Sequence, residues 1–127
     1  MKASAFVDPA NGFVAIVDDM GTLVGYRSFG PDGRVPGGSY DDAALETGGG
    51  LRPDLTGHGY GRAAIEFGLV YGAAKHEPLA FRVTVWSQNE RALKVVKALG
   101  FTPAGQFTAT TDGEEYTILL GPQLRDR

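Results

Sequence analysis

The sequence contains no cysteine among its 127 residues and only two histidines, His58 and His76. Disulfide bonds, thiolate catalysis and cysteine-ligated metal sites are therefore excluded. Two imidazoles are too few to hold a zinc ion without help from carboxylates, so we expect no metal cofactor.

The sequence also lacks any cluster of lysine and arginine and any long apolar run. Its formal net charge is -3, whereas proteins that bind DNA or RNA start from a basic patch. We therefore expect no nucleic-acid partner, and a cationic substrate would suit this charge better. No segment resembles a signal peptide or is long enough to cross a bilayer. The sequence predicts no membrane partner and a cytoplasmic location.

The length and composition predict a single globular domain over residues 1–127. The hydrophobic fraction is 43% and the charged fraction 21%, values typical of soluble proteins. A chain of this length can bury one core but not two.

Three glycines at alternate positions, Gly57, Gly59 and Gly61, precede a long run without proline that predicts a helix over residues 60–75. The first amides of a helix have no intrahelical partner and carry the positive end of the helix dipole. Glycines let a ligand approach these amides, so the turn is a candidate phosphate site. An ordinary tight turn is the alternative.

The spacing narrows the choice of phosphate ligand. The dinucleotide fingerprint Gly-x-Gly-x-x-Gly is excluded because Arg62 occupies the place of its last glycine, and no Gly-Lys-Ser/Thr motif follows. The stretch resembles the acyl-CoA pyrophosphate loop of the GNAT superfamily of N-acyltransferases, which reads Gln or Arg, two residues, Gly, one residue, Gly or Ala. Gly59 and Gly61 match this pattern, and Thr56 stands where Gln or Arg is usual.

The other segments predict a mixed, mostly antiparallel sheet. We expect strands at residues 13–17, 22–29, 40–51 and 80–86, and a closing hairpin at residues 101–120. The strands at 40–51 and 80–86 should run parallel, because the first helix connects them. Residues 1–12 are too short and ambiguous for an assignment.

A second helix strengthens the resemblance. Ser87 is its expected N-cap and Glu90 completes a capping box, while Gly100 ends it. Asn89, two residues and Ala92 open this helix and Leu-Gly-Phe closes it, as in the last segment of the GNAT core. The segment follows the glycine turn by about thirty residues, as in the family.

The resemblance implies a GNAT-like α/β fold with a central β-α-β unit whose two parallel strands splay apart. Acetyl-CoA would bind in the gap as co-substrate, with its pantetheine arm bonded to backbone. The turn amides would bind the pyrophosphate, and Asn89 would contact the arm or steady the gap. The implied cofactor-binding residues are Leu51, Arg52, Gly57, His58, Gly59, Tyr60, Gly61, Arg62 and Asn89.

Each of the polar side chains in that set has a simpler explanation. Arg62 could add a charge-assisted bond to phosphate or could be a solvated charge on the helix surface. His58 is expected to face solvent rather than to act in catalysis. Asn89 could merely open the second helix.

The implied reaction is transfer of acetyl to a primary amine of a small molecule or peptide. It needs a neutral amine, a polarised thioester carbonyl and a proton for the leaving thiolate. Glu46, five residues before Leu51, stands where the family's water-linked general base is common; a surface carboxylate is the alternative. Asp41 and Asp42 would attract a cationic amine or belong to a solvated loop.

The chain departs from the family at two points. The usual acid is a tyrosine seven residues after the motif asparagine, and that position is Val96. The thiolate would then leave unassisted, be protonated through water or find another donor. The usual N-terminal strand and helices would also be missing, because only about twelve residues precede Phe13.

An uncovered strand edge invites pairing, so we expect a homodimer. Two other interpretations of the chain remain open at this point. It could be an acyl-CoA-binding module without efficient turnover, or an α/β domain with no ligand in the glycine turn.

Overall fold

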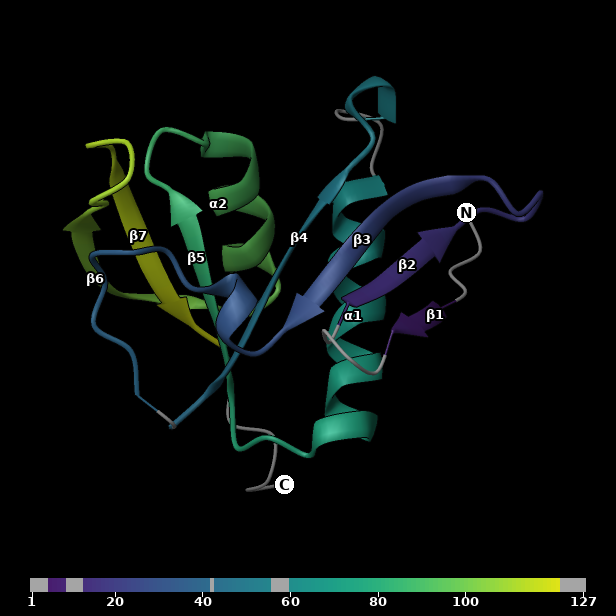
Figure 1. Cartoon of the computed structure of the whole chain (residues 1–127), viewed down its shortest axis with the longest axis horizontal. Helices are drawn as coiled ribbons and strands as arrows, with labels where there is room; N and C mark the ends of the chain where they lie inside the picture. Colours follow the sequence, from purple (N-terminus) through teal and green to yellow (C-terminus); the bar gives the residue numbers. More distant parts are fainter. Residues whose placement is uncertain (1–4, 9–12, 42, 56–59, 122–127) are drawn as a thin grey trace.

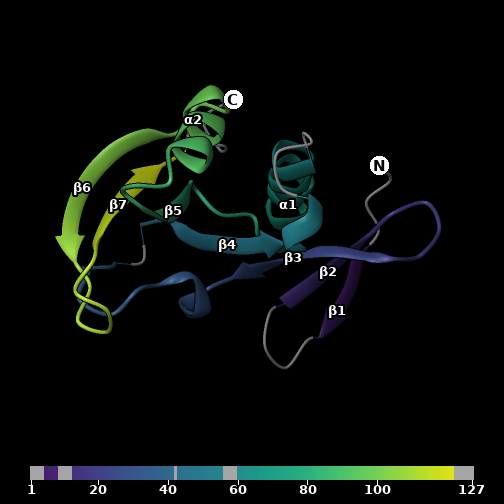
Figure 2. The ribbon, with the colours of Figure 1, turned by 90° about the horizontal axis from the view of Figure 1, so that it is seen from above.

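The computed structural model describes residues 5–8, 13–41, 43–55 and 60–121. Within them the chain forms a seven-stranded sheet in the order β1-β2-β3-β4-β5-β7-β6, with two α-helices on one face (Figures 1 and 2). The strands are β1 Ala5–Asp8, β2 Phe13–Val17, β3 Leu23–Phe29, β4 Leu45–Leu51, β5 Phe81–Trp86, β6 Thr102–Thr108 and β7 Glu115–Leu120. The helices are α1 Tyr60–His76, α2 Glu90–Ala98 and the short 3-10 turns η1 Pro31–Gly33 and η2 Pro53–Leu55. None of the helices in this part of the chain has the length and apolar character needed to cross a bilayer.

The central strands β4 and β5 are parallel, and all other neighbouring strands are antiparallel. The two parallel strands pair only where Leu45 meets Phe81 and Glu46 meets Arg82. Beyond these two positions they diverge as the two arms of a V (Figure 1). The structure therefore confirms the predicted mixed sheet, its central β-α-β unit and the splayed pair.

Two strands differ from the sequence prediction. A strand at Ala5–Asp8 pairs with β2, whereas no strand was expected before Phe13; four residues carry too little pattern, and this strand depends on its neighbour. β4 begins at Leu45 rather than at Tyr40, because the preceding residues fold across β5. There the Tyr40 hydroxyl lies 2.9 Å from Thr84 Oγ1 and accepts a hydrogen bond from the Val35 amide.

The N-cap of α2 is also different from the prediction. Asn89 caps the helix by accepting a hydrogen bond from the Ala92 amide at 3.1 Å. The expected N-cap, Ser87, instead has its hydroxyl 2.8 Å from Thr117 Oγ1 on β7. The C-terminal end is as predicted, since Gly100 follows the helix with a φ of 98° that favours glycine.

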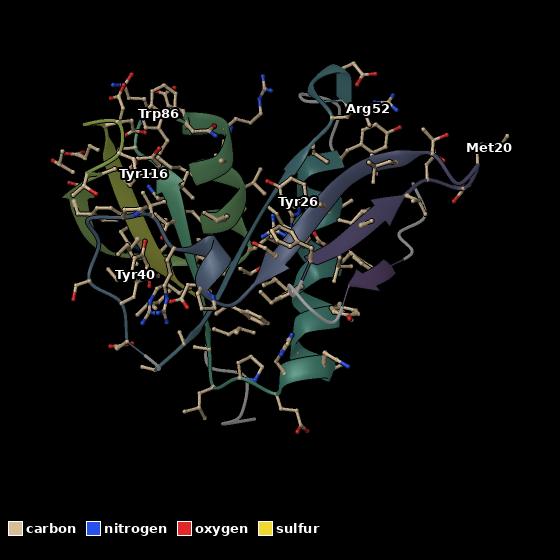
Figure 3. All side chains as sticks on the ribbon, in the orientation of Figure 1. Met20, Tyr26, Tyr40, Arg52, Trp86 and Tyr116 are labelled. Carbon is tan, nitrogen blue, oxygen red and sulfur yellow. The ribbon has the colours of Figure 1, made fainter. Side chains whose placement is uncertain are left out.

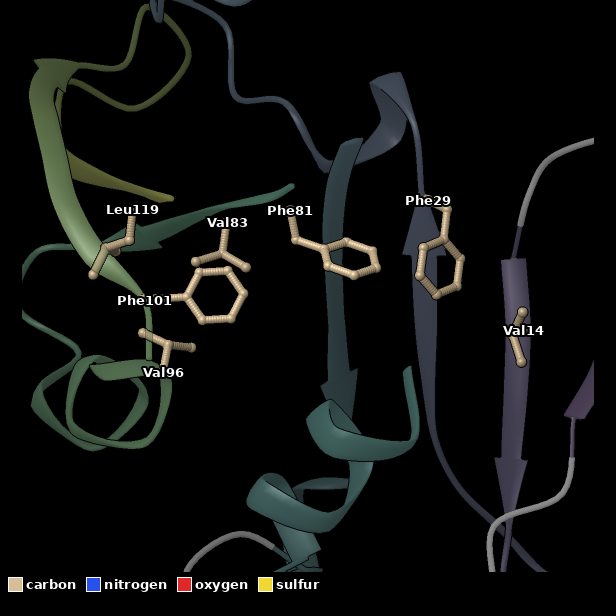
Figure 4. Packing of buried hydrophobic residues seen from close by; sticks show 7 residues of the cluster. All are labelled: Val14, Phe29, Phe81, Val83, Val96, Phe101 and Leu119. Atoms are coloured by element: carbon tan, nitrogen blue, oxygen red, sulfur yellow. The ribbon is translucent and has the colours of Figure 1, made fainter. Parts of the chain in front are cut away.

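Helix α1 packs closely on the sheet through its smallest residues, Ala64, Gly68 and Gly72, which are all buried. A β-carbon at Gly72 would lie 2.6 Å from Phe29 Cε1 and 3.0 Å from Phe81 Cε1. These two rings belong to a cluster of buried side chains that lie in a row across the sheet (Figure 4). Helix α1 and the sheet therefore approach each other closely along these small residues.

We expect Gly72→Val to lower the free energy of unfolding by about 1–3 kcal/mol, because added methyl groups must displace buried rings. Gly61→Val is the matched control, since a β-carbon there meets only Leu51, at an ordinary 3.7 Å. Urea denaturation of the two variants checks this. Equal stability of both variants would show that α1 can move away from the sheet without cost.

Candidate functional site

The splay of β4 and β5 opens a cleft of about 490 Å³ between the sheet and the first turns of both helices. Its lining includes Gly49, Gly50 and Leu51 of β4, Gly61 of α1, and Asn89 and Ala92 of α2. Residues from three segments that are distant in the sequence therefore converge on one space, and most of the β4 contribution is backbone without a side chain.

The backbone polar groups of β4 alternate between its two neighbours. The Glu46 carbonyl accepts a hydrogen bond from Gly30, and the Arg52 amide donates to Val24, so the even residues of β4 face β3. The Leu45 amide donates to Ala80 beside β5, so the odd residues face the other way. Thr47, Gly49 and Leu51 consequently present their amides and carbonyls to the gap. No described strand pairs with them on that side.

This alternation separates the two residues expected to hold pantetheine. The backbone of Leu51 faces the gap, and its contact with pantetheine stays a prediction. Arg52 does not face the gap, because its amide donates to the Val24 carbonyl at 2.8 Å and its own carbonyl accepts from Leu55 at 2.9 Å. Its side chain pairs with Asp54 at 2.7 Å near the outer end of β4 (Figure 3). The Arg52 prediction is corrected for this reason.

The glycine turn is only partly described. Gly57, His58 and Gly59 lie outside the described residues. Tyr60 begins α1 and Gly61 lines the cleft. Arg62 is at the cleft edge but is half exposed and pairs with Glu66 one turn later, at 2.8 Å. That pairing matches the simpler explanation, a solvated charge on the helix surface.

The two α2 positions singled out from the sequence differ in environment. Asn89 caps the helix, which is the simpler explanation offered for it, and it also lines the cleft. Its contact with the pantetheine arm stays a prediction. Val96 is buried in the hydrophobic core beside Phe101 rather than in the cleft lining. The position of the family's usual acid is therefore part of the apolar core.

Glu46 is a buried carboxylate, with 2% of its surface exposed. Gly49 is on the face of β4 that meets Arg27 beneath α1, and because side chains alternate along a strand, Glu46 projects from the opposite face. Its Oε1 bonds to Arg82, and its Oε2 lies 3.0 Å from Arg34 Nε. A second hollow, of about 340 Å³, reaches both Glu46 and Arg34. The alternative of a surface carboxylate is thus wrong, although this hollow gives the group an approach from solvent.

Arg82 links Glu46 to a second carboxylate. It bonds to Asp41 as well as to Glu46, and its guanidinium carbon lies over the Tyr40 ring, 5.8 Å from the ring centroid. Burial alone would lower the pKa of Arg82, but its bonds to the two carboxylates raise the pKa overall. A hydrogen bond from the Ala43 amide, followed by Arg82, lowers the pKa of exposed Asp41. Asp41 therefore already forms an ion pair with Arg82 within the protein. Asp42, the other acidic residue suggested to attract an amine, lies outside the described residues.

Sequence reasoning did not single out Arg27 on β3, the buried charged residue of the cleft lining. Its side chain is 7% exposed and lines the cleft, and its Nη2 donates to Thr47 Oγ1 at 3.2 Å. Its Nε has no hydrogen-bond partner among the described residues. Burial lowers the pKa of Arg27 to about 10, so the guanidinium stays charged at neutral pH. Only glycines at two distant positions, Gly49 and Gly68, make room for it.

Comparison with known protein families agrees with this geometry. The model of the acetyltransferase (GNAT) family matches residues 2–101 of the chain. The chain therefore belongs to the GNAT acetyltransferase family, and the resemblance seen in its sequence is confirmed. A search of the curated proteins found none that matches the chain.

Solved structures of this family share the fold at low sequence identity. A mutant of spermidine N-acetyltransferase SpeG from Vibrio cholerae is 19% identical, with a TM-score of 0.74 over 91% of this chain and 68% of that one. Ribosomal-protein-S5-alanine acetyltransferase from Vibrio fischeri is 18% identical, with a TM-score of 0.70 over 91% and 63%. A GNAT-family acetyltransferase from Bacillus anthracis is 17% identical, with a TM-score of 0.67 over 86% and 64%.

Proposed function

We propose that this protein is an acetyl-CoA-dependent N-acetyltransferase that acts on a primary amine of a small molecule or peptide. The observation that carries the proposal is the unpaired side of β4. Thr47, Gly49 and Leu51 have backbone donors and acceptors on the side where β4 and β5 part, and Gly49 and Leu51 line the cleft that begins there. An extended chain with amide groups, such as pantetheine, can pair there as an additional strand.

The remaining contacts are proposed from the turn before α1 and from the start of α2. The amides of Gly57, His58, Gly59, Tyr60, Gly61 and Arg62 would bind the pyrophosphate at the positive end of α1. Asn89 would contact the pantetheine arm from α2. Bound acetyl-CoA supplies the activated acetyl group, and the chain's residues position it and handle the protons.

An amine acceptor is supported by charge and by the names of the structural neighbours. The chain has a net charge of -3, which favours a cation over an anion. Two of the neighbours are named for spermidine and for a ribosomal protein alanine, both amine-bearing acceptors.

We also propose, from the sequence, that the protein is a cytoplasmic homodimer. Sedimentation of the purified chain tests the dimer.

We propose Glu46 as the base that takes the amine proton, through a water in the hollow that reaches it. It lies where β4 and β5 part, opposite the cofactor cleft. Its pairing with Arg34 and Arg82 fixes its position. The amine would approach from this face.

We expect Glu46→Gln to lower kcat about 100-fold, the usual cost of losing a general base, and to leave acetyl-CoA affinity within about twofold. Steady-state kinetics and calorimetric titration of the folded variant measure these two quantities. Asp41→Asn is the matched control because Asp41 bonds to the same Arg82 from an exposed position. Full activity of Glu46→Gln across the pH range would rule out this base.

A second candidate function, an acyl-CoA-binding module without efficient turnover, is favoured by one observation. The position of the usual acid is Val96, buried in the core. Incubation with acetyl-CoA and a panel of amines, with thiol release as readout, separates the candidates. Release supports the acetyltransferase, and thermal stabilisation without release supports the module. If acetyl-CoA does not stabilise the protein at all, the cleft does not bind this cofactor.

A further inference from the structure

The cleft contains a buried positive charge that the proposed binding contacts do not use. Arg27 extends from β3 beneath α1, where β-carbons added at Gly49 and Gly68 would come within 2.9 and 3.0 Å of its side chain. Its one hydrogen bond within the described residues goes to the neutral Thr47 hydroxyl. None of the described carboxylates pairs with it, and its Nε has no partner there. A buried charge in this state is costly unless a ligand completes its bonding.

The Arg27 guanidinium lies near the point where β4 and β5 begin to part. Thr47 is the first residue of β4 beyond the two that pair with β5. Arg27 bonds to that residue's side chain, so its guanidinium lies at the narrow end of the V. The helix N-terminus lies at the other, open end, beyond Leu51. A cofactor with its diphosphate at α1 therefore extends its sulfur toward Arg27.

We propose that Arg27 donates a hydrogen bond to the sulfur of the bound thioester and stabilises the thiolate that leaves. This inference rests on the acetyl-CoA function proposed above. Arg27 would thereby assist the leaving thiolate, which Val96 cannot do because it has no proton to donate. Arg27 would stabilise the thiolate by its charge and not by proton transfer. The ligand that completes the bonding of Arg27 is thus the sulfur end of the co-substrate.

The step balances without another reactant. The acceptor nitrogen forms a bond to the acetyl carbon, and the carbon–sulfur bond breaks with its electron pair left on sulfur. The amine proton passes to Glu46 through water. The thiolate remains paired with the Arg27 guanidinium, which keeps its own proton because the pKa of Arg27, at about 10, is well above neutral pH. Solvent protonates the sulfur when CoA departs.

A purely structural role fits these contacts poorly. A methionine could fill the same space between β4 and α1 without burying a charge. We therefore expect Arg27→Met to unfold at a higher temperature than the wild-type protein. If Arg27 served only for packing, Arg27→Met would unfold at a lower temperature than the wild-type protein.

The decisive test compares CoA with desulfo-CoA, which lacks the thiol, by calorimetric titration from about pH 6 to about pH 9, below the pKa of Arg27. For the wild-type protein, the preference for CoA should rise with pH, because the thiolate form pairs with Arg27. In Arg27→Met the bound thiol should titrate about one pH unit higher or more, which reduces the alkaline preference about tenfold. Arg27→Lys, which retains the charge, should keep most of the preference.

Arg91→Met is the matched control. The other charged residues in the cleft lining are Arg62 and Arg91, and both are exposed at the helix ends. Removing Arg91 should change the affinities for CoA and desulfo-CoA by the same factor. An unchanged preference in Arg27→Met, with both ligands bound, would overturn the inference and leave the cofactor proposal intact. Failure of the wild-type protein to bind either ligand would overturn both.

Discussion

Ala92→Trp is expected to weaken acetyl-CoA binding by at least about 100-fold, because the indole would fill the space between α2 and β4. Ala92 is half-buried and lines the cleft on the first turn of α2. Its side chain projects into a space that the protein itself leaves open, so folding should change by less than about 1 kcal/mol. Calorimetric titration and urea denaturation of the same preparation measure both effects.

Ala98→Trp is the control for this substitution. Ala98 is the last residue of the same helix, is exposed and does not line the cleft. Acetyl-CoA should bind to it as it does to the wild-type protein. If the two tryptophan variants bound acetyl-CoA equally well, the cleft between β4 and α2 would not be the cofactor site.

Arg82→Met is expected to lower the free energy of unfolding by about 3–5 kcal/mol, the usual cost of removing one partner from a buried ion pair. Glu46 would keep Arg34 as its remaining partner, but its Oε1 would lose its charged donor. Asp41 would lose the same guanidinium. Urea denaturation at neutral pH measures the change.

The double variant Glu46→Met/Arg82→Met shows whether the lower free energy of unfolding comes from the Glu46 carboxylate that has lost its partner. Apolar residues of similar size can replace a buried ion pair at little cost. The double variant should therefore recover most of the stability that Arg82→Met loses. If it were the less stable of the two, packing by the Arg82 stem rather than its charge would be responsible.

Most of the fold could be predicted from local patterns. Phe81, Val83 and Val85 alternate with polar residues, which identified β5, and a proline-free run after the glycines identified α1. A helix between two strands then requires a parallel pair. These patterns depend only on near neighbours in the sequence, which is why they were reliable here.

The errors came from partners that are distant in the sequence. Ser87 and Asn89 are both good N-cap residues, and the structure uses Asn89 because Ser87 bonds to Thr117, thirty positions away. Leu51 and Arg52 are adjacent, but only the odd residues of β4 face the gap. Such choices depend on the register of the sheet, which the local sequence does not show.

Arg27 could not have been found from the sequence for a related reason. Its burial depends on Gly49 in β4 and Gly68 in α1, two glycines that only the folded chain brings to it. Within β3 it looks like an ordinary polar residue of an alternating strand. In the folded chain, Arg27 is buried and its side chain lines the cleft.

The central claim is that the parted strands β4 and β5 hold the thioester arm of acetyl-CoA. A crystal structure of the protein with acetyl-CoA tests it most directly. We predict that the pantetheine arm lies between the two strands, with hydrogen bonds to the backbone of Gly49 and Leu51 and the sulfur beside Arg27. Density for the cofactor elsewhere on the molecule, with the gap between the strands left empty, would contradict the account.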